Sequence, residues 1–343
     1  MKALVYEDKG RIQVQDRDIP TPAAGELLVR VSHTGICGTD LHVWHGGMKR
    51  VKPPVILGHE FSGVVEQAGS SSSEFEQGDR VTVEPLITCG VCPACRAGFY
   101  NVCSNLKLLG VDTDGAMAHY VVVPEHRTYR LSDRLSLKDA AFVEPLAVCV
   151  HMVERSGLES GQTCLVVGGG PIGLITAFAA RLKGANVLIS EMNAYRIQLA
   201  QGYGFDVINP LQGDLRGKIR DATAAKGVDV SFEATGSPQG TTACVENTGI
   251  RGTVAICGLP KQLHEVDTYQ FIAKELSVYG SRVYTRSDYE QALALIESGR
   301  FKPEWLISRT VSLDEAIEHG FEAIQRGDAL MKVLISLENE AGR

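Results

Sequence analysis

Short runs of alternating apolar and polar positions fill the chain from residue 1 to about residue 135, with Gly and Pro between them. The runs ELLVRVSHTG, FSGVVEQAG, GDRVTVEP and AHYVVVPEH have the period of two that is typical of β-strands. Helical periodicity is scarce in this region. The pattern predicts an all-β, barrel-like first domain.

Helical spacing begins at about Ser136, and the pattern then changes for the rest of the chain. The segment SLKDAAFVEPLAVCVHMVERSGL has the apolar spacing of a helix, with Ser136 as candidate N-cap and Pro145 as an expected kink or interruption. Strand-like and helix-like runs then alternate, which predicts βαβ units and a doubly wound parallel sheet. Beyond about residue 284, two helix-like pieces precede MKVLISL, an apolar strand that can return to pair with the first domain.

A glycine-rich turn joins the first of the later strands to its helix. In LVVGGGPIGLITAFAARLKG, the residues Gly168, Gly170 and Gly173 form G-x-G-x-x-G between an apolar run and an apolar helix. In a dinucleotide site the first glycine permits the tight turn, the second lets a pyrophosphate approach the backbone, and the third lets the helix pack against the strand. A lone motif of this kind is often only a flexible turn, but here strand, helix and a following acidic residue are all in place. The sequence therefore predicts a Rossmann-type nucleotide site.

Glu191 ends the next strand and indicates which nucleotide to expect. Its carboxylate can accept hydrogen bonds from both ribose hydroxyls and would repel a 2′-phosphate, which favours NAD over NADP. Arg196 lies nearby and could be recruited by a phosphate, so a strict preference does not follow. The predicted cofactor-binding residues are Gly168, Gly170, Pro171, Ile172, Gly173, Glu191 and Arg196.

Length and charge narrow the class of protein. At 343 residues two domains are expected, and 44% hydrophobic with 22% charged residues is typical of a soluble globular protein. A net charge of −7 disfavours a phosphate backbone as partner, so no nucleic acid is predicted. No signal peptide or membrane span is predicted, because charge follows soon after Met1 and a Gly-Gly-Gly-Pro turn interrupts the long uncharged stretch 161–180. We therefore expect a cytoplasmic protein without membrane contact.

Nine cysteines are unevenly distributed, and four of them lie within fifteen residues. In a reducing compartment such a cluster indicates metal ligation rather than disulfides. Cys89, Cys92, Cys95 and Cys103 have the spacing C-x2-C-x2-C-x7-C, which suits a tetrahedral zinc with four thiolates and no open position. We predict a structural zinc loop that neither binds substrate nor activates water.

A second set of candidate ligands is spread over the segments GICGTDLH, GHEFSGVV and FVEPLA. Cys37, His59 and Glu60 offer sulfur, nitrogen and oxygen donors, and Glu144 is a further candidate. Mixed ligands with an open position are typical of catalytic zinc. Each of these residues taken alone is more often structural than a metal ligand.

These motifs occur together in one family. With GICGTDLH, LGHEFSGVV, GDRVTVEP, the four-Cys loop and GGGPIG, the chain resembles the zinc-dependent medium-chain alcohol dehydrogenases over essentially its full length, and most of all their polyol, threonine and butanediol dehydrogenase branch. The resemblance implies an α/β protein with a GroES-like β-barrel catalytic domain, 1–147 and 285–343, and an inserted Rossmann domain, 148–284. It implies Glu60 as a zinc ligand with Glu144 close to the metal, two zinc ions per subunit, and a homotetramer or dimer.

The same resemblance implies a reaction. Zinc acts as a Lewis acid on an alcohol, a hydride passes from carbon to the nicotinamide, and a proton leaves for solvent. Thr39, the cofactor ribose and His42 would form the proton relay, Glu144 is the third predicted catalytic residue, and Asp40 is expected to make a local hydrogen bond. The favoured substrate is a secondary alcohol of polyol or sugar-acid type, with L-threonine or 2,3-butanediol as alternatives. A non-catalytic zinc or nucleotide-binding protein is the remote alternative, and it would lack a ligand or relay residue, whereas all are present.

Overall fold

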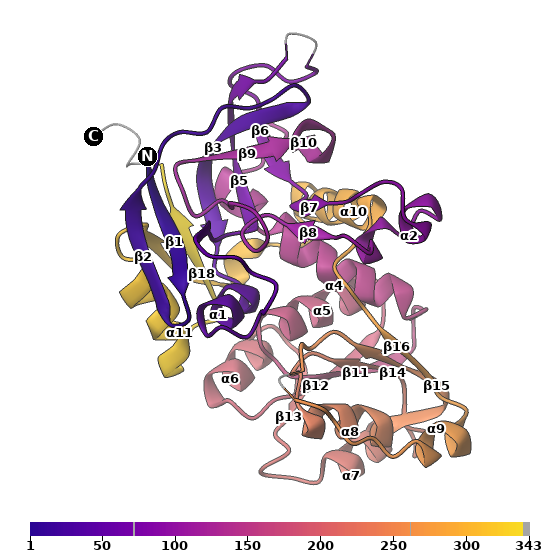
Figure 1. The fold of residues 1–343 in the computed structure, drawn as a ribbon. Helices are drawn as coiled ribbons and strands as arrows, with labels where there is room; N and C mark the ends of the chain where they lie inside the picture. The colour runs from indigo at the N-terminus through magenta and orange to yellow at the C-terminus, as the bar shows by residue number, and fades with distance from the viewer. Residues whose placement is uncertain (71–72, 261, 339–343) are drawn as a thin grey trace. The chain divides into compact units, whose positions relative to one another are not determined.

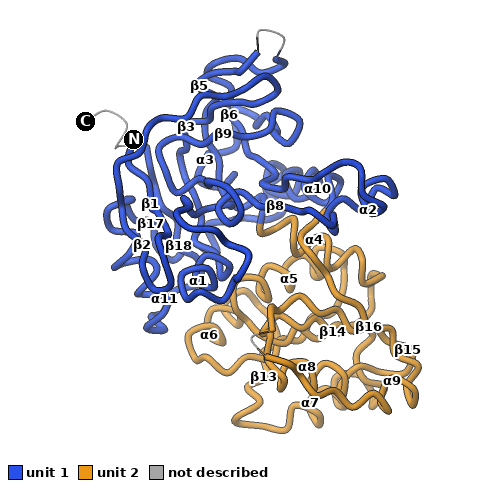
Figure 2. The backbone as a smooth tube through the Cα atoms, in the orientation of Figure 1, with its two compact units in different colours: residues 1–144, 285–343 blue, residues 145–284 orange. Residues whose placement is uncertain are grey.

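The computed structural model describes residues 1–70, 73–260 and 262–338 (Figure 1). The chain forms two compact units: unit 1 contains residues 1–144 and 285–343, and unit 2 contains residues 145–284 (Figure 2). Unit 2 is one continuous segment, whereas unit 1 is built from both ends of the chain. Unit 2 begins at Pro145, whereas the family resemblance implied a boundary at residue 148.

Unit 1 consists mainly of short strands. They are β1 (Lys2–Asp8), β2 (Arg11–Asp16), β3 (Glu26–Gly35), β4 (Val55–Ile56), β5 (Glu60–Ala68), β6 (Arg80–Val83), β7 (Leu86–Ile87), β8 (Lys107–Leu108), β9 (Tyr120–Pro124), β10 (Thr128–Arg130), β17 (Ile307–Ser312) and β18 (Lys332–Ser336). A seven-stranded sheet has the order β10-β6-β5-β3-β18-β17, with β9 also paired to β3. Smaller sheets have the orders β2-β1-β4 and β7-β8.

Helical segments of unit 1 are short, except for one near the C-terminal end. They are α1 (Gly38–Trp44), α2 (Pro93–Arg96), η1 (Tyr100–Val102), η2 (Glu125–Arg127), α3 (Leu137–Ala140), α10 (Arg286–Glu297), η3 (Pro303–Trp305), the π-helical η4 (Ala316–Glu322) and α11 (Ala323–Arg326). The last two form the second of the helix-like pieces predicted after residue 284. That piece starts later than its sequence suggests, because β17 runs through Ser312.

Strand β3 is the centre of the large sheet. Its residues Leu27, Val29 and Val31 are buried, in keeping with neighbours on both edges. Strand β18 runs antiparallel to it, with Leu334 opposite Gly35. The prediction that the apolar C-terminal run returns to the first domain is confirmed.

Unit 2 is a parallel sheet with helices. Its strands are β11 (Thr163–Val167), β12 (Asn186–Ser190), β13 (Asp206–Ile208), β14 (Val228–Glu233), β15 (Thr248–Ile256) and β16 (Ser277–Gly280). Its helices are α4 (Val143–Arg155), which starts at the boundary, α5 (Pro171–Leu182), α6 (Ala194–Gly202), α7 (Leu215–Ala222), α8 (Pro238–Asn247) and α9 (Tyr269–Lys274).

All six strands are parallel in the order β13-β12-β11-β14-β15-β16, which is the predicted doubly wound sheet. The strand order reverses between β11 and β14. Ligands of such sheets bind outside the carboxyl ends of the strands at this reversal.

The helix predicted from Ser136 is divided in two. Ser136 caps α3 as expected, because its hydroxyl accepts a hydrogen bond from the Asp139 N–H. The helix ends at Ala140 and α4 starts at Val143, so the interruption precedes Pro145 instead of falling on it. Pro145 lies in the first turn of α4, where a backbone N–H has no partner to lose. Within the described residues, no helix is long and apolar enough to cross a membrane.

Candidate functional site

Cys37, His59 and Glu60 come together in unit 1. Cys37 immediately precedes α1, and Glu60 is the first residue of β5. One sulfur, one ring nitrogen and one carboxylate oxygen lie within 4.8 Å of one another. His59 and Glu60 are buried and Cys37 is half-buried. This set of three different donors, from two distant segments, fits a zinc ion that keeps a position open.

The register between β3 and β5 brings these segments together. Gly35, the last residue of β3, lies opposite Glu60. A Cβ atom at residue 35 would lie 2.1 Å from Glu60 Oε2, so glycine leaves the room that the carboxylate occupies. The strand pairing therefore places Cys37, which follows β3 directly after Ile36, beside His59 and Glu60.

Asp40 supports the cluster from α1. Its Oδ2 accepts a hydrogen bond of 2.8 Å from the Cys37 N–H, and its Oδ1 lies 3.6 Å from His59 Nδ1. Complete burial raises the pKa of Asp40 above its ordinary value. Burial alone would lower the pKa of His59, but the negative charges of Asp40 and Cys37 raise it well above its ordinary value. The predicted local hydrogen bond of Asp40 is confirmed. Its contact with His59 was not predicted from the sequence.

Lys332 is a charged neighbour that the sequence analysis missed. It lies at the start of β18 and forms an ion pair with Glu60, and the two side chains are 4% and 1% exposed. Burial alone would lower the pKa of Lys332, but the negative charges of Glu60 and Cys37 raise it. The available signal was a single charged residue inside the apolar run MKVLISL, because lysine is rarely buried without a partner.

Glu144 lies in the first turn of α4 and is buried. Its negative charge acts on both His59 and Lys332. Its carboxylate does not belong to the group of donor atoms within 4.8 Å that the described residues form around Cys37. Of the two glutamates that the sequence offered, Glu60 is the one that joins Cys37 and His59.

Thr39 and His42 lie on α1, the helix that follows Cys37. Both are half-buried, and their spacing places them on one face of the helix. The His42 ring packs against Gly47, where a Cβ atom would approach it to 2.6 Å. The two predicted relay residues are therefore close to the cluster in the chain, on a helix that Cys37 itself starts.

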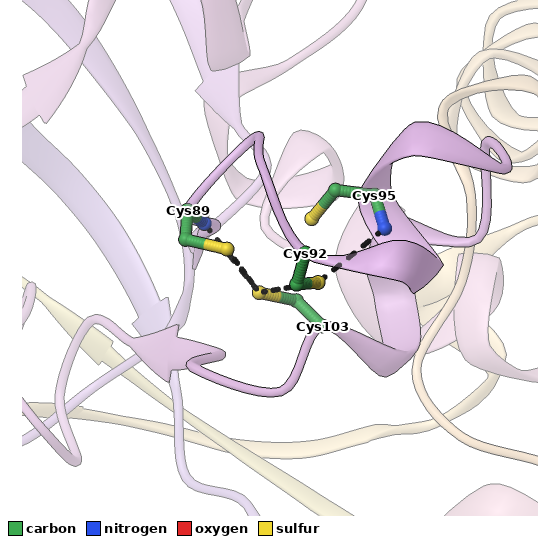
Figure 3. A group of neighbouring side chains, drawn as sticks. All are labelled: Cys89, Cys92, Cys95 and Cys103. Carbon is green, nitrogen blue, oxygen red and sulfur yellow. Dashed lines mark hydrogen bonds between the residues drawn. The ribbon is translucent and has the colours of Figure 1, made fainter.

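The four thiols of Cys89, Cys92, Cys95 and Cys103 also come together (Figure 3). Cys103 Sγ lies 3.5 Å from Cys89 Sγ and 3.9 Å from Cys92 Sγ. A backbone hydrogen bond from Cys95 is the first cause that lowers the pKa of Cys92 to about 6. None of the four forms a disulfide. The donor set fits a tetrahedral zinc held by four thiolates.

A buried ion pair links this loop to the sheet. Arg127 Nη1 lies 2.9 Å from Glu84 Oε1, and Arg127 Nη2 donates a 3.2 Å hydrogen bond to Thr88 Oγ1. The guanidinium also lies over the ring of Tyr100, 4.2 Å from its centroid. Tyr100 belongs to the cysteine loop, so Arg127 attaches that loop to the body of unit 1.

The glycine-rich turn follows β11 in unit 2. Gly168 has a φ of +99°, and a Cβ atom at Gly173 would lie 1.7 Å from Gly168 O, so helix and turn are in direct contact. At Gly170, the N-cap of α5, the nearest atom to a Cβ would be an arginine tip 3.4 Å away. Pro171 and Ile172 are the first residues of α5. The backbone is therefore open beside a helix N-terminus, as a pyrophosphate requires.

Glu191 follows β12 and faces the same turn. Its Oε2 accepts a 2.7 Å hydrogen bond from the Gly169 N–H. Its Oε1 accepts hydrogen bonds from the N–H groups of Met192 and Asn193, at 2.6 and 2.8 Å. Arg196 Nη1 lies 3.8 Å from Oε2. Backbone groups thus orient this carboxylate, with one cation beside it.

Comparison with known proteins places these features in a class. Residues 23–133 match the alcohol dehydrogenase GroES-like domain, and residues 171–298 match the zinc-binding dehydrogenase family. The chain is 38% identical to the 2-dehydro-3-deoxy-L-galactonate 5-dehydrogenase of Pseudoalteromonas atlantica, over 99% of this chain and 100% of that protein. It is 33% identical to the sorbitol dehydrogenase of Bacillus subtilis, over 98% and 97% of the two chains.

A solved structure of a zinc-binding dehydrogenase from Sinorhizobium meliloti, bound to NADP, superposes with a TM-score of 0.91 at 37% identity and covers 98% of each chain. The chain therefore belongs to the zinc-dependent medium-chain alcohol dehydrogenases. It is an oxidoreductase whose cofactors are zinc and a nicotinamide nucleotide. The predicted combination of a GroES-like domain with a Rossmann-type sheet is confirmed.

Proposed function

We propose that this enzyme uses NAD to oxidise a secondary alcohol of polyol or sugar-acid type to the ketone. The observation that carries the proposal is the buried cluster of Cys37, His59 and Glu60 in a chain that also holds a dinucleotide fingerprint. The relatives from Pseudoalteromonas atlantica and Bacillus subtilis bear the names of a sugar-acid dehydrogenase and a sorbitol dehydrogenase, and these names support the substrate class.

Each metal cluster has a separate task in this proposal. Cys37, His59 and Glu60 would hold the reactive zinc, with Glu144 beside them as a further carboxylate. Zinc held there supplies a Lewis acid that lowers the pKa of an alcohol. The four cysteines of the 89–103 loop would hold a second, structural zinc, which makes two zinc ions per subunit.

Side chains of α1 would move the proton. The hydroxyl of Thr39 would accept the proton of the substrate alcohol as it gives up its own, and the imidazole of His42 would release a proton to solvent. The two side chains would be connected through the ribose of the bound cofactor. Their placement on one helix face supports this relay, as does the half-burial of both side chains, which leaves a route to water. Glu144 adds a fixed negative charge near His59 and Lys332.

Glu191 supports NAD as the nucleotide. A ribose bears two hydroxyls for its carboxylate, whereas a 2′-phosphate would meet a negative charge that three backbone N–H groups hold in place. Arg196 beside it and the NADP bound in the Sinorhizobium meliloti structure support NADP as the second candidate. A ratio of kcat/KM for NAD to that for NADP below one would overturn the choice of NAD.

We also propose a cytoplasmic homotetramer or dimer. Strand β16 is an edge of its sheet, and exposed large apolar side chains gather near it in the chain: Ile250, Leu259, Leu263, Tyr269, Ile272 and Val278. A second copy that extends the sheet edge would cover such groups. Four free thiols in one loop also support a reducing compartment, where cysteines bind metal rather than form disulfides. A monomer in light scattering would exclude the oligomer.

The test of the reaction is a substrate panel. NADH formation is measured with four- to six-carbon polyols, sugar acids, L-threonine and 2,3-butanediol, with and without a zinc chelator. We expect the highest kcat/KM with a polyol or sugar acid, and loss of the rate with chelator. A higher kcat/KM for L-threonine or 2,3-butanediol would overturn the substrate class, and a chelator-resistant rate would overturn the zinc mechanism.

A further inference from the structure

Glu233 is the last residue of β14 and lies where the strand order of the unit 2 sheet reverses. The carboxyl ends of β11 and β14 flank this reversal. The glycine fingerprint follows β11, and the sequence analysis assigned no role to the segment that follows β14. Glu233 is fully buried, an unusual position for a carboxylate that no metal or substrate role explains.

The Glu233 carboxylate is surrounded by donors from its own loop. Oε1 accepts hydrogen bonds from the N–H groups of Thr235 and Gly236, at 2.8 and 3.0 Å, and from the Thr235 hydroxyl. Oε2 accepts a further one of 3.1 Å from the Gly236 N–H. The successive N–H groups of the 235–236 turn therefore bind the Glu233 carboxylate as such groups bind an anion. This carboxylate stabilises the conformation of the turn.

Neighbouring strand ends pack directly against this turn. A Cβ atom at Gly258, after β15, would lie 2.1 Å from Gly236 N and 2.5 Å from Glu233 Oε2. The Glu233 carbonyl also accepts hydrogen bonds from the N–H groups of Cys257 and Gly258, at 3.0 and 3.1 Å. Glu233 therefore joins the loop after β14 to the loop after β15.

The same turn reaches the fingerprint. A Cβ atom at Gly168 would lie 2.7 Å from the methyl carbon of Thr235, so Thr235 packs on the first glycine of the motif. On the other side of that motif, the Gly169 N–H donates to Glu191. The phosphate-binding turn is held between two loops, and each loop is shaped by a buried carboxylate.

We propose that Glu233 is a positioning residue of the nucleotide site. Its carboxylate holds the 235–236 turn in place, and this turn packs against Gly168 of the fingerprint through Thr235. This inference rests on the proposed binding of NAD. Glu191 would contact the ribose, whereas Glu233 has its oxygens occupied by its own loop and acts only through Thr235. Loss of its charge would loosen the 235–236 turn and weaken nucleotide binding without changing the oxidation of the alcohol.

The test compares NADH binding to zinc-loaded enzymes by titration calorimetry. Glu233→Gln keeps the size of the side chain but loses one acceptor oxygen, and we expect the Kd for NADH and the KM for NAD to rise roughly tenfold. The kcat and the KM for the alcohol should stay within about twofold. Thr235→Val keeps a methyl group towards Gly168 but loses the hydroxyl that donates to Glu233, and we expect a roughly threefold rise.

Ser231→Ala is the matched control. Ser231 lies on β14 as well, is fully buried, and shares a 2.7 Å hydrogen bond with Thr248, away from the carboxyl end of the strand. Its loss should lower Tm but leave the Kd for NADH unchanged. An unchanged Kd in Glu233→Gln, or an equal rise in Ser231→Ala, would overturn the inference. If Glu233→Gln does not fold, an unchanged Kd in Thr235→Val overturns it. Wild-type enzyme that binds no NADH would overturn the proposed function as well.

Discussion

The two candidate metal sites of unit 1 differ in the spacing, burial and surroundings of their donors. The four-cysteine loop takes all its donors from fifteen consecutive residues, and three of its four thiols are only half-buried. The Cys37–His59–Glu60 cluster takes its donors from two segments and places two of them in the interior. Charged partners surround the second cluster, with Asp40 at His59 and Lys332 at Glu60. Thiols of the four-cysteine loop instead accept hydrogen bonds from backbone N–H groups.

Closely spaced ligands in the sequence therefore do not by themselves mark the site that we propose as reactive. Four thiolates complete the coordination of a zinc ion and leave nothing for a substrate, whereas three mixed donors leave a position open. Charged groups beside a metal ligand tune its charge and orientation. The sparse cluster has such neighbours, which fits its proposed role as the reactive zinc site, whereas the dense cluster fits the proposed structural zinc site.

Replacement of Cys37 should have the largest effect. In Cys37→Ser we expect kcat/KM to fall by roughly a thousandfold or more, about 4 kcal/mol of transition-state stabilisation, because the reactive zinc loses its thiolate. Metal analysis should show one zinc lost of two, with an unchanged circular dichroism spectrum. Full activity in this variant would overturn the zinc mechanism proposed for the Cys37 cluster.

Replacement of Lys332 tests the charged surroundings. In Lys332→Met the buried Glu60 loses its counter-ion, and we expect the metal-free enzyme to lose about 3 kcal/mol of unfolding free energy. The zinc affinity of the same cluster should rise roughly tenfold, since Glu60 no longer shares its charge with an ammonium. Chelator competition measures the affinity. The double variant Lys332→Met with Glu60→Gln should recover the stability, and a double variant no more stable than Lys332→Met would contradict the pairing.

Replacement of Cys92 should affect stability and leave turnover intact. In Cys92→Ser we expect Tm to fall by roughly 5–10 °C, because the loop loses a thiolate of its closed site. The kcat per folded molecule should stay within about twofold of wild type, since the reactive cluster is separate. A large drop in kcat at temperatures well below Tm would contradict the structural role.

Replacement of Asp40 should have the smallest of these effects. Asp40→Asn keeps an acceptor for the Cys37 N–H but removes the negative charge beside His59. We expect zinc affinity at the reactive cluster to fall roughly tenfold, the lower end of the range for such supporting residues. Chelator competition again measures it, with Cys92→Ser as the control that should leave this affinity unchanged. Equal affinities in Asp40→Asn and wild type would remove Asp40 from the metal site.

Much of the architecture could be predicted because it depends on local patterns. The alternating runs of the first 135 residues indicated the strands of unit 1, and the G-x-G-x-x-G run indicated a strand, a turn and a helix. The helix was predicted to break at Pro145, but the break lies earlier, between Ala140 and Val143. A proline is compatible with the first turn of a helix, so Pro145 does not interrupt α4. The late start of the last helical piece followed from the extension of β17 through Ser312, which is stabilised by pairing with β18.

The candidate groups can be read directly from the sequence: four closely spaced cysteines, a glycine fingerprint, and the residues Cys37, His59, Glu60 and Glu144. Folding is needed to bring Glu60 to Cys37 and His59, to pair Glu60 with Lys332, and to form the hydrogen bonds of Glu233 with the turn beside the fingerprint. The physical reason is distance along the chain. A motif within one loop fixes its own geometry, whereas a pair such as Glu60 and Lys332 exists only after β3 has paired with β5 on one side and β18 on the other.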